Sequence, residues 1–260
     1  KGFGFLLGAM VLTLFGFVPS VLAMAGLLGG ILCAALALMP KGLPMGRKDT
    51  KFSEVFSKNR NINWLSLARL FLFGARDVWF VVGIPIYFCA VLSDGSTEGN
   101  RAAFFMIGTF MAVWTILYGA VQAAAPRILR ATKTTSADKL AQAKRWLLPL
   151  IVVPLVLSAL VWSTPAPTAP LTITIVLGLL AFGAVFAVNS ALHSYLILSF
   201  TDARRVTMDV GFYYMANAAG RLVGTVLSGL TYQTGGLPLC LLTAATMIAL
   251  GWCATAKLQH

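Results

Sequence analysis

Acidic residues are scarce in this sequence. The chain has 8 Asp and Glu against 20 Lys and Arg, and charged residues make up only 11% of it. Soluble domains average about 25% charged residues, so the composition excludes an ordinary soluble globular domain. The formal net charge of +12 raises the question of a nucleic-acid partner. The basic residues lie in short segments between apolar runs and form no surface interleaved with exposed aromatic residues, which argues against nucleic acid.

Cysteine is rare too, and the usual catalytic motifs are missing. Cys33, Cys89, Cys240 and Cys253 are scattered through apolar segments, without a CxxC or other metal-ligand spacing. They are interpreted as small buried apolar residues. The sequence has no HExxH, no GxSxG and no paired catalytic carboxylates. We therefore expect a protein that is not an enzyme and that needs neither a metal nor another cofactor.

Long apolar runs are what the sequence has instead. Hydrophobic residues make up 58% of the chain, and its mean hydropathy is +0.84. A helix needs about 20 apolar residues to cross a bilayer. The pattern predicts an all-α membrane protein. Eight transmembrane helices are expected, over residues 2–17, 21–39, 62–92, 102–125, 146–163, 171–200, 210–232 and 237–256.

The segments between these spans alternate in charge. Residues 40–60, 126–145 and 201–209 hold six, six and two Lys or Arg, whereas 18–20, 93–100, 164–170 and 233–236 hold none. Cytoplasmic loops carry the excess of Lys and Arg in membrane proteins. The basic segments and the C-terminus are therefore predicted to be cytoplasmic, in the inner membrane of a bacterium.

The basic segment 40–60 separates two spans from six. We expect residues 1–39 to be the last two helices of an N-terminal six-helix half, 40–60 a cytoplasmic linker, and 61–260 a C-terminal six-helix half. Parallel repeats of this kind occur in twelve-helix transporters. A basic residue followed by small residues recurs six helices apart, after Lys1 and after Arg221. On this prediction the visible chain begins inside a helix, four helices precede it, and Lys1 lies near mid-membrane.

Charged residues inside one span are the strongest functional signal. Arg69 and Arg76 are seven residues apart in the span 62–92, so they share a helix face. A charge at the bilayer centre costs roughly 3 kcal/mol on insertion scales. Arg69 lies about 10 Å from the cytoplasmic end and could also snorkel to the headgroups; Arg76 lies about 21 Å in. Arg76 could instead pair with Asp77 or with another helix, although adjacent residues diverge by about 100°, which would direct Asp77 to a different helix.

Further polar residues accompany these charges. Arg221 lies beside a small-residue stripe, Gly220, Gly224 and Ser228, which lets another helix approach closely. Asn217, Tyr213 and Tyr214 lie earlier in that helix and are either hydrogen-bonding groups of a cavity or interfacial anchors. His193 is either a proton relay or a packing residue. Asp209 is predicted to cap its helix or to interact with the helix dipole.

The surplus of deep positive charge favours an anionic solute. Arginine's planar guanidinium matches the geometry of carboxylate, phosphate and arsenate. We therefore predict Arg76, Arg221, Arg69, Lys1, Asn217 and Tyr213 as substrate-binding residues, and Asp77 and His193 as candidates for proton coupling.

The same residues carry a resemblance to a known family. The chain resembles the ArsJ-type organoarsenical efflux permeases of the major facilitator superfamily over most of its length. The runs concerned are Asn59-Arg-Asn-Ile-Asn63, Ala68-Arg69-Leu-Phe-Leu-Phe-Gly-Ala-Arg76-Asp77-Val-Trp-Phe-Val-Val82, Lys1-Gly-Phe-Gly-Phe-Leu-Leu-Gly8, Tyr118-Gly-Ala-Val-Gln122 with Ala125-Pro126, and Tyr213-Tyr-Met-Ala-Asn-Ala-Ala-Gly-Arg221-Leu-Val-Gly-Thr225. The basic segment 126–145 departs from the superfamily, because it lacks the usual Gly-x-x-x-Asp-Arg-x-Gly-Arg-Arg pattern.

The resemblance implies export of 1-arseno-3-phosphoglycerate and thereby arsenate resistance. That solute forms when a glyceraldehyde-3-phosphate dehydrogenase uses arsenate in place of phosphate, so the resemblance implies a functional link to this enzyme. Alternating access and proton antiport follow from the superfamily. Two alternatives stay open: a major facilitator exporter of another organic anion or a drug, and a membrane module that transports nothing.

Overall fold

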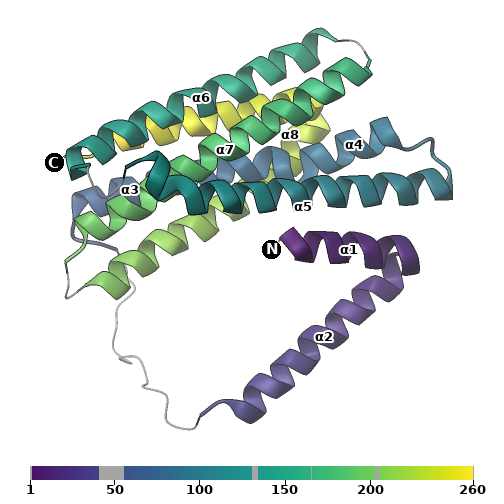
Figure 1. The fold of residues 1–260 in the computed structure, drawn as a ribbon, viewed down its shortest axis with the longest axis horizontal. Coiled ribbons are helices and arrows are strands. Elements are labelled where there is room, and N and C mark those ends of the chain that lie inside the picture. Colours follow the sequence, from purple (N-terminus) through teal and green to yellow (C-terminus); the bar gives the residue numbers. More distant parts are fainter. Residues whose placement is uncertain (1, 41–55, 131–133, 165, 203–204, 260) are drawn as a thin grey trace.

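Helices account for all the regular secondary structure in the described part of the chain. The structure, a computed structural model, describes residues 2–40, 56–130, 134–164, 166–202 and 205–259. The elements are α1 (Gly2–Phe15), α2 (Phe17–Leu38), α3 (Arg60–Asp77), a π-helical segment η2 (Val78–Gly83), α4 (Ile84–Leu92), α5 (Thr97–Ile128), α6 (Ser136–Ser163), α7 (Ala169–Phe200) and α8 (Val206–Ala256) (Figure 1). Six of the described helices are long and apolar enough to cross a membrane, α3, η2 and α4 counting as one. The expected all-α, membrane-spanning class is confirmed, whereas the count of eight spans and the division into 1–39, 40–60 and 61–260 stay predictions.

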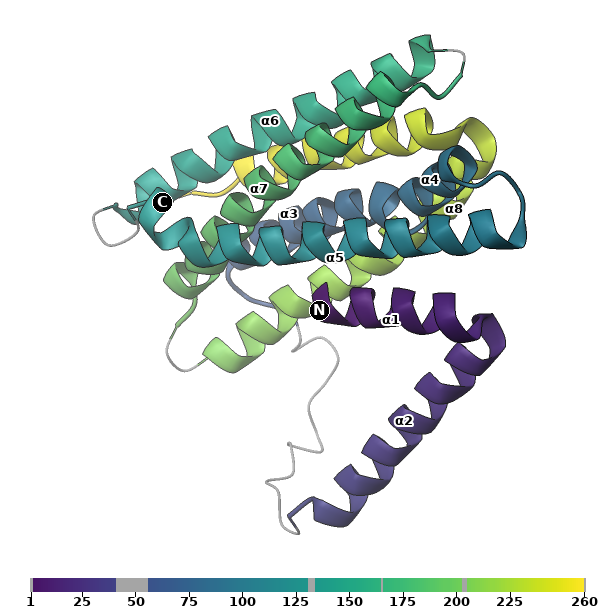
Figure 2. The same cartoon turned by 45° about the vertical axis from the view of Figure 1, so that its right-hand side comes forward.

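The last two predicted spans are joined in one helix, α8, with a sharp kink. Gly235 has φ −150° and Gly236 has φ 64°, ψ −159°, and neither is helical. The chain reverses there, so α8 forms a hairpin of two arms, visible as the green-to-yellow turn in Figure 2. The predicted turn at 233–236 is therefore where the backbone breaks, because glycine reaches a positive φ without the steric cost of a Cβ.

The break between the first two helices was predicted in the wrong place. Val18 and Pro19 were expected to separate them, but both belong to the first turn of α2, and the break is at Gly16, with φ 79°. Proline is accommodated in a first helical turn, where its missing N–H has no partner to lose. Glycine, and not proline, therefore marks this boundary.

The second basic segment is mostly helical, contrary to the prediction of a loop over 126–145. Arg127 lies in the last turn of α5, and Lys139, Lys144 and Arg145 lie on α6. Helix α6 begins ten residues before the predicted start because Thr135 and Asp138 form a reciprocal capping box. Helix α6 therefore begins with polar turns that precede its apolar segment, 146–163.

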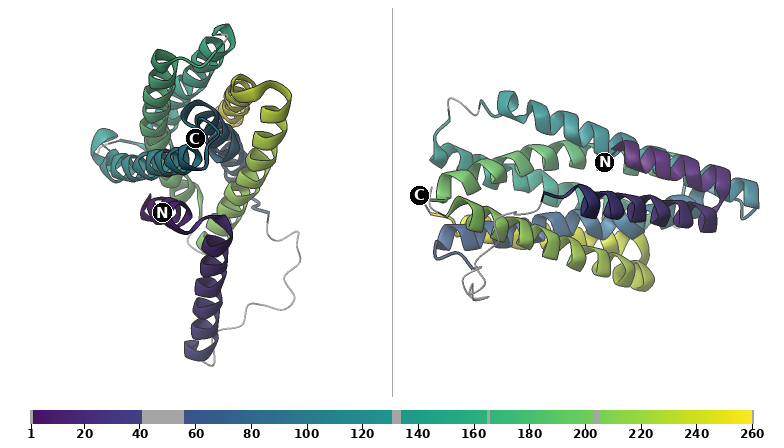
Figure 3. Two further views of the ribbon diagram at one scale, coloured as in Figure 1. Left: turned by 90° about the vertical axis from the view of Figure 1, so that its right-hand side faces the viewer. Right: turned by 90° about the horizontal axis from the view of Figure 1, so that it is seen from below.

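The bundle is built around α3 and α8. Helix α3 packs along α8, α6 packs on both α7 and α8, α5 packs on α7, and α1 lies along α5 (Figures 1 and 3). Helix α2 projects away from the bundle, and Ser20 is its one buried residue. The core is rich in aromatic rings: fully buried Trp79 makes edge-to-face contacts with Trp114 and Phe182.

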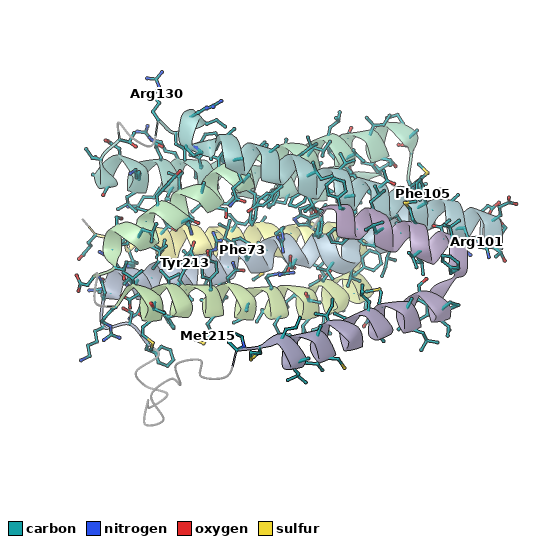
Figure 4. The ribbon with its side chains drawn as sticks, turned by 60° about the horizontal axis from the view of Figure 1, so that its bottom comes forward. Phe73, Arg101, Phe105, Arg130, Tyr213 and Met215 are labelled. Carbon is teal, nitrogen blue, oxygen red and sulfur yellow. The ribbon has the colours of Figure 1, made fainter. Side chains whose placement is uncertain are left out.

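The helix ends fall into two groups at opposite ends of the bundle. At one end, the side chain of Asn59 donates to the Phe200 carbonyl, and Asn61 exchanges hydrogen bonds with the backbone of Gln259. These bonds join the start of α3 to the end of α7 and to the C-terminus. Figure 4 shows Arg130 at this end and Arg101 at the other.

Candidate functional site

A cavity of about 960 Å³ lies between the helices, with one wall on α3 and the first arm of α8 and another on α5. It is lined by Gly4, Phe5, Met24, Arg69, Phe73, Arg76, Asp77, Phe80, Val81, Pro85, Met111, Trp114, Thr115, Tyr118, Gln122, Ser194, Tyr214, Asn217 and Arg221. Its charged lining consists of three arginines and one aspartate. A cavity with this surplus of positive charge attracts an anion.

Close packing positions the two helices that carry these charges. A Cβ added to Gly220 would collide with the backbone of Leu70, and one added to Gly224 would collide with the backbone of Gly74. The backbones of α3 and α8 therefore touch directly, as the small-residue stripe predicts. The third member of that stripe, Ser228, is fully buried and accepts a hydrogen bond of 3.3 Å from the Gly83 amide.

Asp77 is bound by two arginines at this crossing. Arg76 donates to its Oδ1 from Nε, at 2.7 Å, and from Nη2. Arg221, on α8, donates from Nε to its Oδ2 at 2.9 Å. Asp77 is 1% exposed, so both carboxylate oxygens are engaged inside the protein. The cluster has three charges and a net charge of +1.

The ion pair of Arg76 with its neighbour corrects one expectation. Asp77 does reach another helix, through Arg221, but Arg76 also folds back onto it. The divergence of about 100° describes the Cα–Cβ directions of adjacent residues. The long arginine side chain bridges that angle, so the two charges share the site.

Arg69 is held inside the bundle and does not snorkel. Its side chain is buried, and Nη1 donates to the Ser190 hydroxyl at 2.9 Å and to the Ser190 carbonyl at 3.3 Å. The guanidinium carbon lies 3.9 Å from the centre of the Phe73 ring and 4.9 Å from that of Tyr213. Both rings are buried, and both residues are labelled in Figure 4. Cation–π contacts of this kind replace part of the lost hydration.

The remaining predicted residues divide between the cavity and the core. Asn217 lines the cavity. Tyr213 does not line the cavity. It is 1% exposed, and its ring packs against the Arg69 guanidinium. His193 is fully buried outside the cavity lining, and neither ring nitrogen has a hydrogen-bond partner among the described residues. Lys1 lies outside the described residues.

Asp209 is not the cap of its helix. Helix α8 begins at Val206, so Asp209 belongs to its first turn, where its charge still suits the helix dipole. Its carboxylate accepts a hydrogen bond of 2.9 Å from the Thr201 hydroxyl. The predicted capping role is wrong because the helix extends four residues further back than its apolar run.

Several cavity residues escaped the sequence prediction. Trp114, Tyr118 and Gln122 form one stripe of α5, and the rings of Trp114 and Tyr118 are stacked with centroids 5.7 Å apart. The spacing of four residues was a visible signal for a shared face. The spacing alone did not show that this face of α5 lines the cavity. Tyr214, which is 56% exposed, was expected in the cavity or at the membrane interface, and it does line the cavity.

No group of three or more His, Cys, Asp or Glu side chains within the described ranges could hold a metal ion. Comparison with family models, with curated proteins and with solved structures finds no match to this chain.

Proposed function

We propose that this chain is a secondary transporter that exports an anionic organoarsenical by alternating access. The observation that carries the proposal is the cavity at the α3–α8 crossing, whose charged lining is Arg69, Arg76 and Arg221 against Asp77. Intramembrane ionisable residues are costly and typically mark a solute pathway. Their surplus of positive charge favours an anion, and the resemblance to organoarsenical permeases points to the same class of solute.

The proposed solute is 1-arseno-3-phosphoglycerate. It carries an arsenate group and a phosphate group, and both have the oxygen geometry that a guanidinium recognises through paired N–H donors. Arg221 has the most accessible guanidinium of the three, because its side chain is 51% exposed and only Nε is engaged with Asp77. A cavity of about 960 Å³ has room for such a solute, since small-molecule sites range over roughly 300–1,000 Å³.

The proposed setting is a major facilitator fold in a bacterial inner membrane. On this proposal, α1 and α2 belong to one half of the transporter and α3 to α8 to the other, with the two arms of α8 as separate spans. The kink at Gly235 and Gly236 supports that division. The end of the bundle that carries the C-terminus is rich in basic residues, which supports a cytoplasmic location for it.

A second candidate function is export of another organic anion. Six aromatic side chains line the same cavity: Phe5, Phe73, Phe80, Trp114, Tyr118 and Tyr214. Aromatic walls suit an anion with an apolar or aromatic body, which a short phosphorylated acid does not have. This lining is the observation that favours the second candidate.

Arsenate resistance tests the proposal directly. The gene is expressed in an arsenic-sensitive bacterium together with a glyceraldehyde-3-phosphate dehydrogenase, and growth is measured against arsenate concentration. We expect resistance that requires the dehydrogenase and that is lost in Arg76→Ala and Arg221→Ala. Arg101→Ala is the matched control, because Arg101 is exposed at the end of the bundle and outside the cavity lining.

The outcomes separate the alternatives. If both cavity variants keep full resistance at equal membrane expression, the assignment of the binding residues is wrong. If the unmodified protein gives no resistance but reduces the accumulation of an aromatic carboxylate or phosphate in cells, the second candidate replaces the first.

A further inference from the structure

Asp77 already occupies the arginines that the proposed solute would bind. Its two oxygens accept hydrogen bonds from Arg76 and Arg221, so in the empty cavity a carboxylate of the protein takes the place of a bound oxyanion. A bound oxyanion and Asp77 would use the same type of donor. The two must therefore compete for at least one guanidinium.

The two arginines differ in how firmly Asp77 holds them. Arg76 belongs to the same helix, donates twice to one oxygen, and has a side chain that is 14% exposed. Arg221 reaches across from α8, donates once, and has a side chain that is 51% exposed. Its two terminal amino groups make no hydrogen bond to any described residue. Arg221 is therefore the arginine that an incoming anion can take over.

We propose that Asp77 is an internal counter-anion that sets the affinity of the cavity for anions by competing with them for Arg221. The inference rests on the proposed function only in taking the solute to be an oxyanion. When the solute is bound, Arg221 turns its guanidinium from Asp77 to the solute while Arg76 keeps the Asp77 charge compensated. When the solute leaves, Asp77 takes Arg221 back. The carboxylate thus weakens binding and assists release.

The substitution Asp77→Asn tests this competition. The asparagine keeps the size of the side chain and removes the charge, so Arg221 loses its competing partner. The apparent dissociation constant scales inversely with the fraction of binding-competent protein. If Arg221 is free for about a tenth of the time in the unmodified protein, we expect the variant to bind oxyanions about tenfold more tightly.

The measurement uses the purified full chain in detergent, with 3-phosphoglycerate and phenyl phosphate as anionic probes and glycerol as the neutral probe. Isothermal titration gives the dissociation constants. Asp94→Asn is the matched control, since it removes one negative charge from an exposed loop outside the cavity. We expect tighter binding of an anion only in Asp77→Asn and no binding of glycerol in either variant.

A double variant tests the competition in the absence of Arg76. Arg76→Gln with Asp77→Asn releases Arg221 from Asp77, whereas Arg76→Gln alone leaves Asp77 as a competitor for Arg221. We expect the double variant to bind the anion more tightly than Arg76→Gln alone. If Asp77→Asn alone does not elute as a folded species in gel filtration, this double variant tests the role of Asp77 in its place.

The inference fails if folded Asp77→Asn binds both anions no more tightly than the unmodified protein, or if neither it nor the double variant binds any anion. Failure of the proposed function looks different. If the unmodified protein binds phenyl phosphate and not 3-phosphoglycerate, the proposed solute class is wrong. The ratio of phenyl phosphate affinities between variant and unmodified protein then still decides the role of Asp77.

Discussion

Buried charges in this protein depend on a few short-range partners. Arg69 has one side-chain hydrogen-bond acceptor, the Ser190 hydroxyl, and rests on the Phe73 ring. Its Nε has no partner among the described residues. Inside a protein each missing hydrogen bond to a charged group is expensive. Single substitutions next to these charges should therefore have large effects.

Removing the Ser190 hydroxyl should destabilise the protein. Ser190→Ala leaves the Arg69 guanidinium with the weaker 3.3 Å contact to the carbonyl alone. Hydrogen bonds to charged groups contribute about 1.5–3 kcal/mol, so we expect a loss of about 2 kcal/mol in the free energy of unfolding. Unfolding of the purified protein in detergent measures it.

Ser163→Ala is the control for this substitution, because the Ser163 hydroxyl is exposed and donates only to the Leu160 carbonyl. We expect almost no change from it. Equal stabilities of Ser190→Ala and Ser163→Ala would show that Arg69 does not depend on Ser190.

The crossing of α3 and α8 is the element-scale feature that holds the site together. It has no room for side chains at Gly220 and Gly224, and Asp77 and Arg221 meet across it. Directly beyond Asp77 the helix widens into η2, and the Gly83 amide at the end of η2 donates to Ser228 on α8. π-helical turns are frequent at functional sites.

Gly220→Ala should force the two helices apart. The added Cβ meets the Leu70 backbone, which cannot rotate away as a side chain could. Overpacking a tight contact costs typically 1–3 kcal/mol, so we expect a loss of roughly that size in the free energy of unfolding. Gly229→Ala, on the same arm of α8, meets nothing within 4 Å and is the matched control. A Gly220→Ala variant as stable as Gly229→Ala would contradict the backbone contact.

Gly236→Ala should strain the hairpin of α8. Gly236 has φ 64° and ψ −159°, a region that side-chain-bearing residues rarely adopt. Such strain costs about 1–3 kcal/mol. Gly211→Ala, in open space within the same helix, should be neutral or slightly stabilising, since alanine favours a helix by up to about 1 kcal/mol. Thermal unfolding of the two variants gives the comparison, and a harmless Gly236→Ala would refute the strained turn.

At the scale of the whole molecule, the two ends of the bundle differ in charge. The end that carries the C-terminus has more basic than acidic side chains among the described residues: Lys58, Arg60, Arg127, Arg130, Lys139, Lys144, Arg145, Arg205 and Lys257 against Asp138, Asp202 and Asp209. The opposite end, around the loop between α4 and α5, holds Asp94, Glu98 and Arg101. This asymmetry is the basis for the proposed orientation.

Labelling of single cysteines should show which end faces the cytoplasm. In a background with the four native cysteines replaced, Glu98→Cys should react with a membrane-impermeant maleimide in intact cells. Ala137→Cys should react only after permeabilisation, because the positive end is expected inside. Both positions are exposed, so each would be labelled once reached. The reverse pattern would invert the proposed orientation.

The sequence was sufficient for the helical class and for the locations of the major apolar segments, because apolar runs are local signals. Helix ends were less predictable: Thr135 extends α6, and Gly16 ends α1, through capping and backbone conformation that hydropathy does not detect. For the site, the spacing of Arg69 and Arg76 predicted a shared face, and both line the cavity. The pairing of Asp77 with Arg221 depends on two helices far apart in sequence, so no local pattern could specify it.

The charges lining the cavity also link the proposed transport cycle to the membrane potential. With three arginines and one aspartate, the empty cavity carries a net charge of +2. The phosphate of the proposed solute carries about −1.5 to −2 and its arsenate adds further negative charge, so the loaded cavity is net negative. The loaded transporter would then move negative charge outward, away from the negative interior. The empty one would return two positive charges toward a negative interior, and each charge gains about 2.3 kcal/mol per 100 mV that it crosses. The resting potential of the cell would thus drive the return step and keep export moving in one direction.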